Sequence, residues 1–465
     1  MASIRKYERN NGTTYQITVI TGTDSKGKQI RHYKTWRPPD NLKGRQLQKE
    51  VQKVAADFEK MIELGYDIDN NQTFSEYADY VLKLKERSGT KVRTIDIYRD
   101  QLRRINPAIG HLKLTEIRPQ HLNSFYANLA EEGVRDTVPK AVCKIDLAPL
   151  LKKRKITRPL LSKLSGVNID TIDNAVHKKS ISLPKAEAIC KALKLKLEET
   201  FNINRDNRPL SNKTILEHHR LIRLILAQAE KEMLVLYNAA ARATPPKVKT
   251  KEAETFQQNE IQMILEKAKL EPLKWRTIIH LIAITGARRG EIAGLQWSKV
   301  DWVNNKILID TALLYSTCRG TYTDTTKTHT ARFIKLPEET MQLLREYRKW
   351  WLMERMKNRD RWEETDFLFI GDKGGHIHPD TISSHLATFG KKYGLEKCHP
   401  HKFRHSMASL LIYNHTDLVA VSKRLGHAKV STTTDIYAHQ IQEADANASE
   451  CIADILLRNP QKKTG

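Results

Sequence analysis

A proline- and lysine-rich stretch divides the chain and limits what it can fold into. Residues 243–251 read Ala-Thr-Pro-Pro-Lys-Val-Lys-Thr-Lys, a composition typical of a linker because consecutive prolines stop helices and strands. From Thr73 to this stretch, apolar residues recur at helical spacing, whereas the residues after it mix helical and strand patterns. We therefore expect a multidomain, mainly α-helical chain with a boundary near residue 245.

The first 70 residues predict a small α+β domain with a three-stranded sheet. Residues 4–9 and 15–21 flank Asn11-Gly12, a strong hairpin signal. A second turn at 24–27 leads into a strand at 29–36, and a helical pattern covers 42–64. The strands are rich in basic side chains, which favours a nucleic-acid-binding face. These side chains are Arg5, Lys6, Arg9, Lys28, Arg31 and Lys34.

Residues 71–245 predict a helical domain with a distinct insert. Thr73 and Glu76 have the spacing of a capping box at the start of an apolar helix. Further helices are expected at 91–105, 118–132 and 211–233. The segment at 138–205 differs from its surroundings because it contains short helix-sized units. These units cover 150–155, 158–164, 168–177, 184–193 and 197–201.

The charge balance indicates a polyanionic partner. The chain has 79 Lys+Arg against 54 Asp+Glu, a formal net charge of +25, and nucleic acid is the default partner for such a protein. No apolar run approaches the length of about 18 residues that a membrane span needs, and the N-terminus lacks the apolar core of an export signal. The 5 cysteines are scattered without a CxxC pair, which fits reduced thiols in a cytoplasm.

Two short signals open the region after the linker. Thr285-Gly-Ala-Arg-Arg-Gly-Glu291 follows an apolar helical pattern and begins another, so Arg288 lies at a helix corner. Lys327 follows between two strand-like segments, at 306–310 and 332–336. Taken alone, each has an ordinary structural explanation, because arginines at helix corners and lysines at hairpin tips are usually solvated.

Three more signals follow in order. His401-Lys-Phe-Arg404-His405 places His401 and Arg404 on one helix face, because residues i and i+3 are neighbours. Leu425-Gly-His427 comes next, and Tyr437 follows ten residues later. The His401–His405 spacing also suits metal ligands, but the glutamate of HExxH and a third ligand motif are missing. We therefore expect no metal site.

Together these motifs resemble one family, the tyrosine recombinases of the phage integrase superfamily. The family has an arginine in a TGxRxxE turn, a hairpin lysine, an HxxRH box, an LGH box and a tyrosine nine or ten residues later. Every element is present here, and the resemblance covers about residues 255–437. It implies a mixed, mostly helical catalytic domain with a small sheet, which transfers DNA strands through a 3′-phosphotyrosine without metal, ATP or other cofactor.

The resemblance also assigns roles to the motif residues. Tyr437 would be the nucleophile, and Arg288 and Arg404 would clamp the phosphate, since guanidiniums are permanent bidentate donors. His401 would accept or relay the phenolic proton. Lys327 would protonate the departing 5′ oxygen and His427 would donate to the phosphate. Glu291 and His405 would support the site.

The remaining regions receive domain assignments from the same resemblance. Residues 1–70 look like an arm-type DNA-binding domain, 71–245 like a core-binding domain, and 246–465 like the catalytic domain. The insert at 138–205 resembles the helix-turn-helix of the Cro/repressor family, with Gly166 at the turn and Ile172 packed inward.

The insert departs from that family in its recognition helix. Residues 168–177 contain Asp170 and Asp173 but no lysine or arginine, whereas DNA contacts usually need basic or amide side chains. DNA contact would then come mainly from flanking basic residues, and a protein-binding or structural role stays open. These basic residues are Lys152, Lys153, Arg154 and Lys155.

We expect a site-specific recombinase that integrates and excises a mobile element, such as a conjugative transposon or prophage. The alternatives are a transcriptional regulator that keeps an idle recombinase domain, and a chromosome-dimer resolvase. Expected partners are double-stranded DNA at core and arm sites, three further copies of the chain in a tetramer, and an excisionase or DNA-bending accessory protein. A helix at 440–456 would pack on a neighbouring copy, and the setting would be the bacterial cytoplasm, at the nucleoid.

Overall fold

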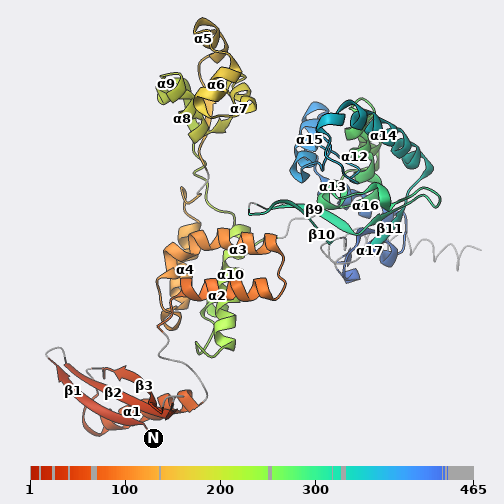
Figure 1. Ribbon diagram of the computed structural model, residues 1–465. Helices are drawn as coiled ribbons and strands as arrows, with labels where there is room; N and C mark the ends of the chain where they lie inside the picture. The colour runs from red at the N-terminus through yellow and green to blue at the C-terminus, as the bar shows by residue number, and fades with distance from the viewer. Residues whose placement is uncertain are drawn as a thin grey trace, which may run out of the picture. The chain divides into compact units, whose positions relative to one another are not determined.

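The computed structural model describes residues 2–9, 12–23, 27–39, 42–63, 71–135, 138–249, 254–316, 318–325, 331–431, 433–434 and 437. Lys327 and the predicted helix at 440–456 lie outside the described residues. The chain forms two compact units, Met1–Lys249 and Thr250–Gly465. Figure 1 shows the elements of both.

The N-terminal domain is an antiparallel sheet with one helix against it. Its strands are β1 (Ser3–Arg9), β2 (Gly12–Thr23) and β3 (Gln29–Trp36), in the order β1-β2-β3. Helix α1 (Gly44–Glu63) packs on one face through Phe58 and Ile62, which contact the buried Ile17 and Val19 of β2. Because side chains alternate along a strand, the other face of the sheet is left open.

The second domain is a helical bundle. It contains α2 (Phe74–Arg87), α3 (Val92–Ile105), α4 (Pro119–Leu129) and α10 (Asn212–Lys231). The predicted capping box is present, with the Thr73 amide donating to the Glu76 carboxylate at 2.9 Å. Apolar residues from all four helices form one core.

The insert has its own core and a small sheet that the sequence pattern does not predict. Its helices are α5 (Leu147–Lys153), α6 (Arg158–Ser165), α7 (Ile169–Val176), α8 (Leu183–Ala192) and α9 (Leu197–Thr200). Strand β4 (Lys140–Cys143) pairs with β5 (Ile181–Ser182) and with β6 (Phe201–Asn204), so the insert leaves and rejoins the bundle through adjacent strands.

The turn between α6 and α7 has the expected geometry. Gly166 ends α6 with φ 68°, a left-handed conformation that suits glycine, and Ile172 is fully buried. The first insert helix begins earlier than predicted, at Leu147, because the Asp146 side chain caps it by accepting from the Ala148 amide at 3.1 Å.

The second unit is helical with two small sheets. Its helices are α11 (Gln258–Ala268), α12 (Leu273–Thr285), α13 (Arg289–Ala293), α14 (Glu338–Lys357), α15 (Pro379–Lys392), α16 (Pro400–Tyr413) and α17 (Leu418–Leu425). Its strands are β7 (Val300–Asp301), β8 (Lys306–Ile309), β9 (Thr311–Ser316), β10 (Gly320–Thr325) and β11 (Arg332–Lys335), in the orders β11-β8-β7 and β10-β9.

The predicted fold class is confirmed: a mainly helical multidomain chain with an N-terminal three-stranded sheet, a helix-turn-helix insert and a mixed second unit. Within the second unit α12 lies at the centre, and its buried residues join the main core. In the part of the chain that the structure describes, no helix combines the length and apolarity needed to span a membrane.

Candidate active site

Arg288 and Glu291 are positioned by the turn between α12 and α13. Gly286 ends α12 in the left-handed region, with φ 59°, and redirects the chain so that Arg288 caps the next helix. The Glu291 carboxylate accepts from the Arg288 backbone amide at 2.9 Å and from Arg288 Nη1 at 2.8 Å. Glu291 is only 1% exposed, so its buried carboxylate holds both the backbone amide and the guanidinium of Arg288 in place.

Burial alone would raise the pKa of the Glu291 carboxyl. The hydrogen bond and charge of Arg332, together with the charge of Arg288, outweigh burial and hold this pKa below its usual value. Glu291 is therefore ionised at neutral pH.

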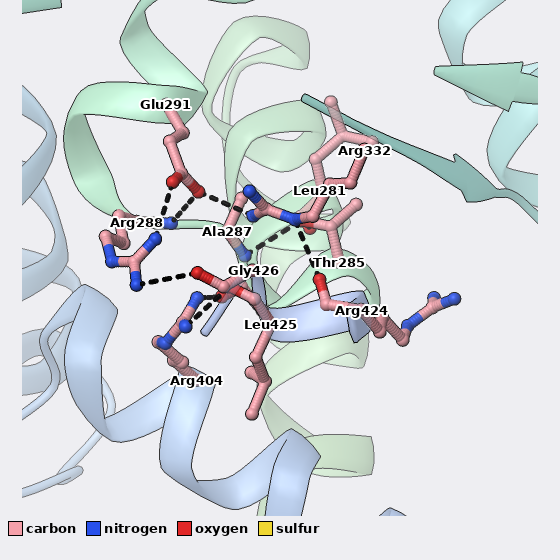
Figure 2. Close-up of polar contacts among 11 residues, drawn as sticks. Leu281, Thr285, Ala287, Arg288, Glu291, Arg332, Arg404, Arg424, Leu425 and Gly426 are labelled. Carbon is pink, nitrogen blue, oxygen red and sulfur yellow. Dashed lines mark hydrogen bonds and ion pairs between the residues drawn. The ribbon is translucent and has the colours of Figure 1, made fainter. Parts of the chain in front are cut away.

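Arg404 lies on α16 and is almost fully buried. Its Nη1 donates to the Gly286 carbonyl at 2.9 Å and its Nη2 to the Leu425 carbonyl at 2.6 Å. Burial, and then the charge of Arg288, lowers the pKa of Arg404 to about 9, which leaves the guanidinium charged at neutral pH. Figure 2 shows Arg404 and Arg288 directed at the adjacent carbonyls of Leu425 and Gly426.

His427 follows the turn that ends α17. Gly426 takes φ 66° there, and its carbonyl accepts from Arg288 Nη2 at 3.4 Å. The Nδ1 of His427 lies 2.8 Å from the Thr433 hydroxyl. Burial and the charges of Arg404 and Arg288 lower the pKa of His427 to about 4. The side chain is thus neutral at pH 7, with Nε2 left to donate when Nδ1 accepts from Thr433.

Tyr437 is buried against α16 and α17. Its ring is 1% exposed and packs with Met407 and Leu425. Its hydroxyl lies 2.8 Å from Nδ1 of His405, and burial raises the pKa of Tyr437 to about 12. The expected partner of this hydroxyl was His401. The structure has His405 in that place, because it lies one helical turn further along α16, beside the cluster that buries the tyrosine.

The structure thus gathers most of the predicted catalytic residues. Arg288 and Arg404 meet at the turn that leads to His427, and His405 links α16 to Tyr437. His401 is exposed on the same helix, with its ring centre 6.5 Å from that of His405. Lys327 falls between β10 and β11, outside the described residues.

Two residues of this site were missed by sequence reasoning. Thr433 is fully buried and holds His427; its only sequence signal is its place between the LGH box and the tyrosine. Arg332 is 7% exposed and binds Glu291. A single arginine in a short strand gives no periodic signal.

The basic residues of the N-terminal sheet lie on different faces. The register pairs Arg5 with Gln16 and Arg31 with Ile20, which puts both arginines on the open face. Lys34 pairs with the buried Ile17 and its ammonium lies 5.6 Å from the Phe58 ring centre, on the face that α1 covers.

Lys6 and Lys28 complete the predicted set on the N-terminal sheet. Lys6 lies in β1 and pairs with Tyr15, on the side of α1, with its ammonium 2.5 Å from the Glu8 carboxylate. Lys28 precedes β3.

In the insert, the basic run at 152–155 begins in the last turn of α5 and continues past its end. Lys152, Lys153, Arg154 and Lys155 are all exposed, and the Arg154 guanidinium also donates to the Leu193 carbonyl at the end of α8. On α7, Asp173 forms an ion pair with Arg158 of α6 at 2.8 Å. Arg154 therefore has a structural contact that its neighbours lack.

The described residues contain no group of three or more His, Cys, Asp or Glu side chains with the arrangement of a metal site. Around the Leu425–Gly426 turn, the charged side chains that the structure describes include the guanidiniums of Arg288, Arg332 and Arg404 and the carboxylate of Glu291.

The fold and this site define a tyrosine recombinase, an enzyme that transfers DNA strands. The chain belongs to the phage integrase family: residues 254–443 match the model of that family, and residues 73–130 match the phage integrase N-terminal SAM-like domain. Residues 146–206 match the Cro/C1-type HTH DNA-binding domain. The predicted family and the predicted class of enzyme are confirmed.

Two known relatives match different shares of the chain. A protein named tyrosine recombinase XerC-like, from Caldanaerobacter subterraneus subsp. tengcongensis, is 22% identical over 98% of this chain and 100% of its own length. The ICEBs1 integrase of Bacillus subtilis is 23% identical over 53% of this chain and 67% of its own.

Among solved structures, the Tn1549 transposon integrase (residues 82–397 of that protein) in complex with a circular intermediate DNA matches with a TM-score of 0.53 and 16% identity. The match covers 81% of this chain and 99% of that one. At this level of identity the likeness concerns the fold.

Proposed function

We propose that this chain integrates and excises a mobile DNA element, such as a conjugative transposon or a prophage. The observation that carries the proposal is the meeting of Arg288 and Arg404 at the Leu425–Gly426 carbonyls, immediately before His427. Relatives named integrases of ICEBs1 and of Staphylococcus phage L54a favour this class of element. The arm-like sheet domain and the insert would supply contacts outside the cleavage site.

The two arginines clamp the scissile phosphate. In-line attack puts extra negative charge on its non-bridging oxygens, and preorganised guanidiniums stabilise that charge without rearrangement. Arg404 keeps further N–H groups for the phosphate, because a guanidinium has five donors and the two carbonyls take two. His427, neutral and held by Thr433, adds a hydrogen bond from Nε2.

Tyr437 attacks phosphorus, and a histidine removes its proton. A phenol with a pKa of about 12 needs a base in contact. Burial and the charges of His401 and Arg404 lower the pKa of His405, so this residue is neutral and its Nδ1 accepts the phenolic proton at 2.8 Å. The exposed His401 relays that proton or contacts the phosphate.

The bond to the 5′ oxygen breaks as the bond to Tyr437 forms. Lys327 gives the departing oxygen its proton, the role that the family gives its hairpin lysine. One phosphoester bond replaces another, so resealing by the 5′ hydroxyl requires neither ATP nor a metal ion.

The other domains hold DNA. Residues 1–70 bind arm sites, residues 71–245 and the catalytic domain at 246–465 bind the core site, and the insert at 138–205 adds contacts from its exposed lysines. Exchange between two duplexes breaks four strands and each chain brings one Tyr437, so four copies assemble on the DNA. An excisionase or DNA-bending protein sets the direction, and the setting is the bacterial cytoplasm, at the nucleoid.

Chromosome-dimer resolution is the second candidate, because a relative that matches 98% of this chain is named tyrosine recombinase XerC-like. The two functions differ in substrate. An integrase recombines the joined ends of an element with a different target, whereas a resolvase recombines two identical chromosomal sites. A transcriptional regulator with an idle site would bind DNA without cleaving it.

A nicked DNA substrate tests the proposal. Cleavage beside the nick releases a short oligonucleotide, so the covalent adduct cannot reseal and accumulates on a denaturing gel. Element ends should give an adduct with the native chain and none with Tyr437→Phe. The absence of adduct on element ends and on chromosomal dimer sites would contradict both candidates, and adduct on dimer sites alone would favour the resolvase.

A further inference from the structure

A third guanidinium, that of Arg332, lies behind the two that face the phosphate. Arg332 begins β11 and is 7% exposed. Its Nη2 donates to Glu291 Oε2 at 2.6 Å, and its Nε donates to the Arg424 carbonyl at 2.8 Å. Figure 2 shows it between the Glu291 carboxylate and the end of α17. Because it is buried, it does not reach DNA itself.

Its first contact concerns charge. The single Glu291 carboxylate binds Arg288 through Nη1 and the backbone amide, and it also binds Arg332. Without Arg332, the buried carboxylate would be balanced by Arg288 alone, and the charge that Arg288 offers a phosphate would be largely cancelled. With Arg332, the Glu291 carboxylate is shared by two guanidiniums, so Arg288 and Arg404 together offer more positive charge to the anionic transition state.

Its second contact concerns position. The Arg424 carbonyl directly precedes Leu425 and Gly426, whose carbonyls accept from Arg404 and Arg288. The Arg332 guanidinium also packs against this turn, since a Cβ placed on Gly426 would lie 2.8 Å from its Nη1. One side chain therefore joins the corner that carries Arg288 to the turn that carries His427.

We propose that Arg332 is a positioning residue for strand cleavage. It compensates the negative charge of Glu291, so that the positive charge of Arg288 remains available to the phosphate, and it fixes the turn before His427. This inference rests on the proposed roles of Arg288 and His427. It gives a function to an arginine that is almost fully buried.

The test compares Arg332→Gln, Glu291→Gln and the double variant in full-length protein. Single-turnover adduct formation on the nicked substrate is measured beside DNA affinity and thermal unfolding. We expect Arg332→Gln to slow cleavage by about 100-fold, because the donors that Arg288 and His427 present to the transition state would be weakened and displaced. DNA affinity should stay within about threefold, since the Arg332 side chain is buried. Arg345→Gln, which breaks an exposed ion pair in the same unit, is the matched control and should cleave like wild type.

Rescue separates charge compensation from a merely structural role. Removing the uncompensated carboxylate as well should make the double variant about 10-fold faster than Arg332→Gln, since one unit charge at this range is worth that much. A double variant no faster than Arg332→Gln, or Arg332→Gln within twofold of wild type, would overturn the proposal. If wild type itself forms no adduct, the proposed function fails, which is a distinguishable result.

Arg332→Lys serves if the glutamine variant does not fold. The lysine ammonium cannot bind Glu291 and the Arg424 carbonyl at the same time, as the planar guanidinium does. The cleavage rate should therefore fall at least about 10-fold, while the melting temperature stays nearly unchanged. Cleavage by Arg332→Lys at the wild-type rate would overturn the proposal.

Discussion

The hydroxyl of Tyr437 lies 2.8 Å from Nδ1 of His405, in a cluster that leaves the tyrosine ring 1% exposed. Burial raises the pKa of this phenol to about 12, so it stays protonated at physiological pH. The histidine that touches the hydroxyl is the second of the HxxRH box, whereas the motif alone suggested the first.

The two histidines should therefore differ in function. His405→Gln should slow adduct formation by about 100-fold at pH 7, the usual cost of losing a general base, and the loss should shrink as pH rises toward the pKa of the phenol. His401→Gln is the matched control, and its loss should not depend on pH in this way. Adduct rates between pH 7 and 10 provide the measurement, and equal pH profiles for the two variants would contradict this assignment.

Arg404 should not tolerate lysine. The guanidinium binds two carbonyls from separate elements, and a single ammonium cannot reproduce that planar contact and also reach a phosphate. Arg404→Lys should reduce the cleavage rate by about 100- to 1,000-fold, while footprinting shows the same protected site. A rate within tenfold of wild type would show that charge alone suffices.

Folding stability should fall in mild acid because of His427. Burial, Arg404 and Arg288 lower its pKa to about 4, below the unfolded value of about 6.5. Between these two pKa values the unfolded chain binds more protons than the folded chain. The contribution of His427 to the free energy of unfolding is therefore fully present near pH 7 and declines as the pH falls from about 6.5 to about 4. His427→Gln should reduce the number of protons taken up on unfolding by up to one. The measurement is the slope of the melting temperature against pH between pH 7 and 4.5. An unchanged slope would contradict the low pKa.

The N-terminal sheet offers a test with an internal control. Arg5 and Arg31 lie on its open face, whereas Lys34 lies on the face that α1 covers. Arg5→Ala and Arg31→Ala should weaken binding to arm-site DNA. Each should also lower the salt slope, which is the steepness with which log affinity falls with log salt concentration, by about 0.9. Lys34→Ala should leave arm-site affinity nearly unchanged. If Lys34→Ala weakens binding as much as the arginine variants do, the open face is not the DNA-binding face.

The insert can be tested without disturbing its fold. Replacing Lys152, Lys153 and Lys155 with glutamine spares Arg154, which binds the Leu193 carbonyl, and should lower the salt slope by about 0.9 for each lost phosphate contact. Asp170→Asn shows whether α7 itself approaches DNA, because removing a repelling carboxylate would then tighten binding. An unchanged slope in the lysine variant would favour a protein-binding or structural role for the insert.

The sequence indicated most residues of the candidate site because their chemical types and their order along the chain are unusual in combination. It indicated the long helices because their apolar residues recur at regular spacing. It did not predict the insert sheet, whose pairing of Lys140 with Asn204 joins distant residues. The β9–β10 hairpin was also missed, since Gly320–Thr325 has no apolar strand pattern. Arg332 was missed because its role depends on a carboxylate and a carbonyl from other elements.

In the proposed mechanism, Tyr437 becomes covalently joined to DNA. Trapped adduct can be digested with nuclease and protease, and the peptide that carries the remaining phosphonucleotide identified by mass spectrometry. The modification should lie on Tyr437, and Tyr437→Phe, which keeps the ring, should give no modified peptide. A phosphonucleotide on another residue, or an adduct that survives Tyr437→Phe, would contradict it.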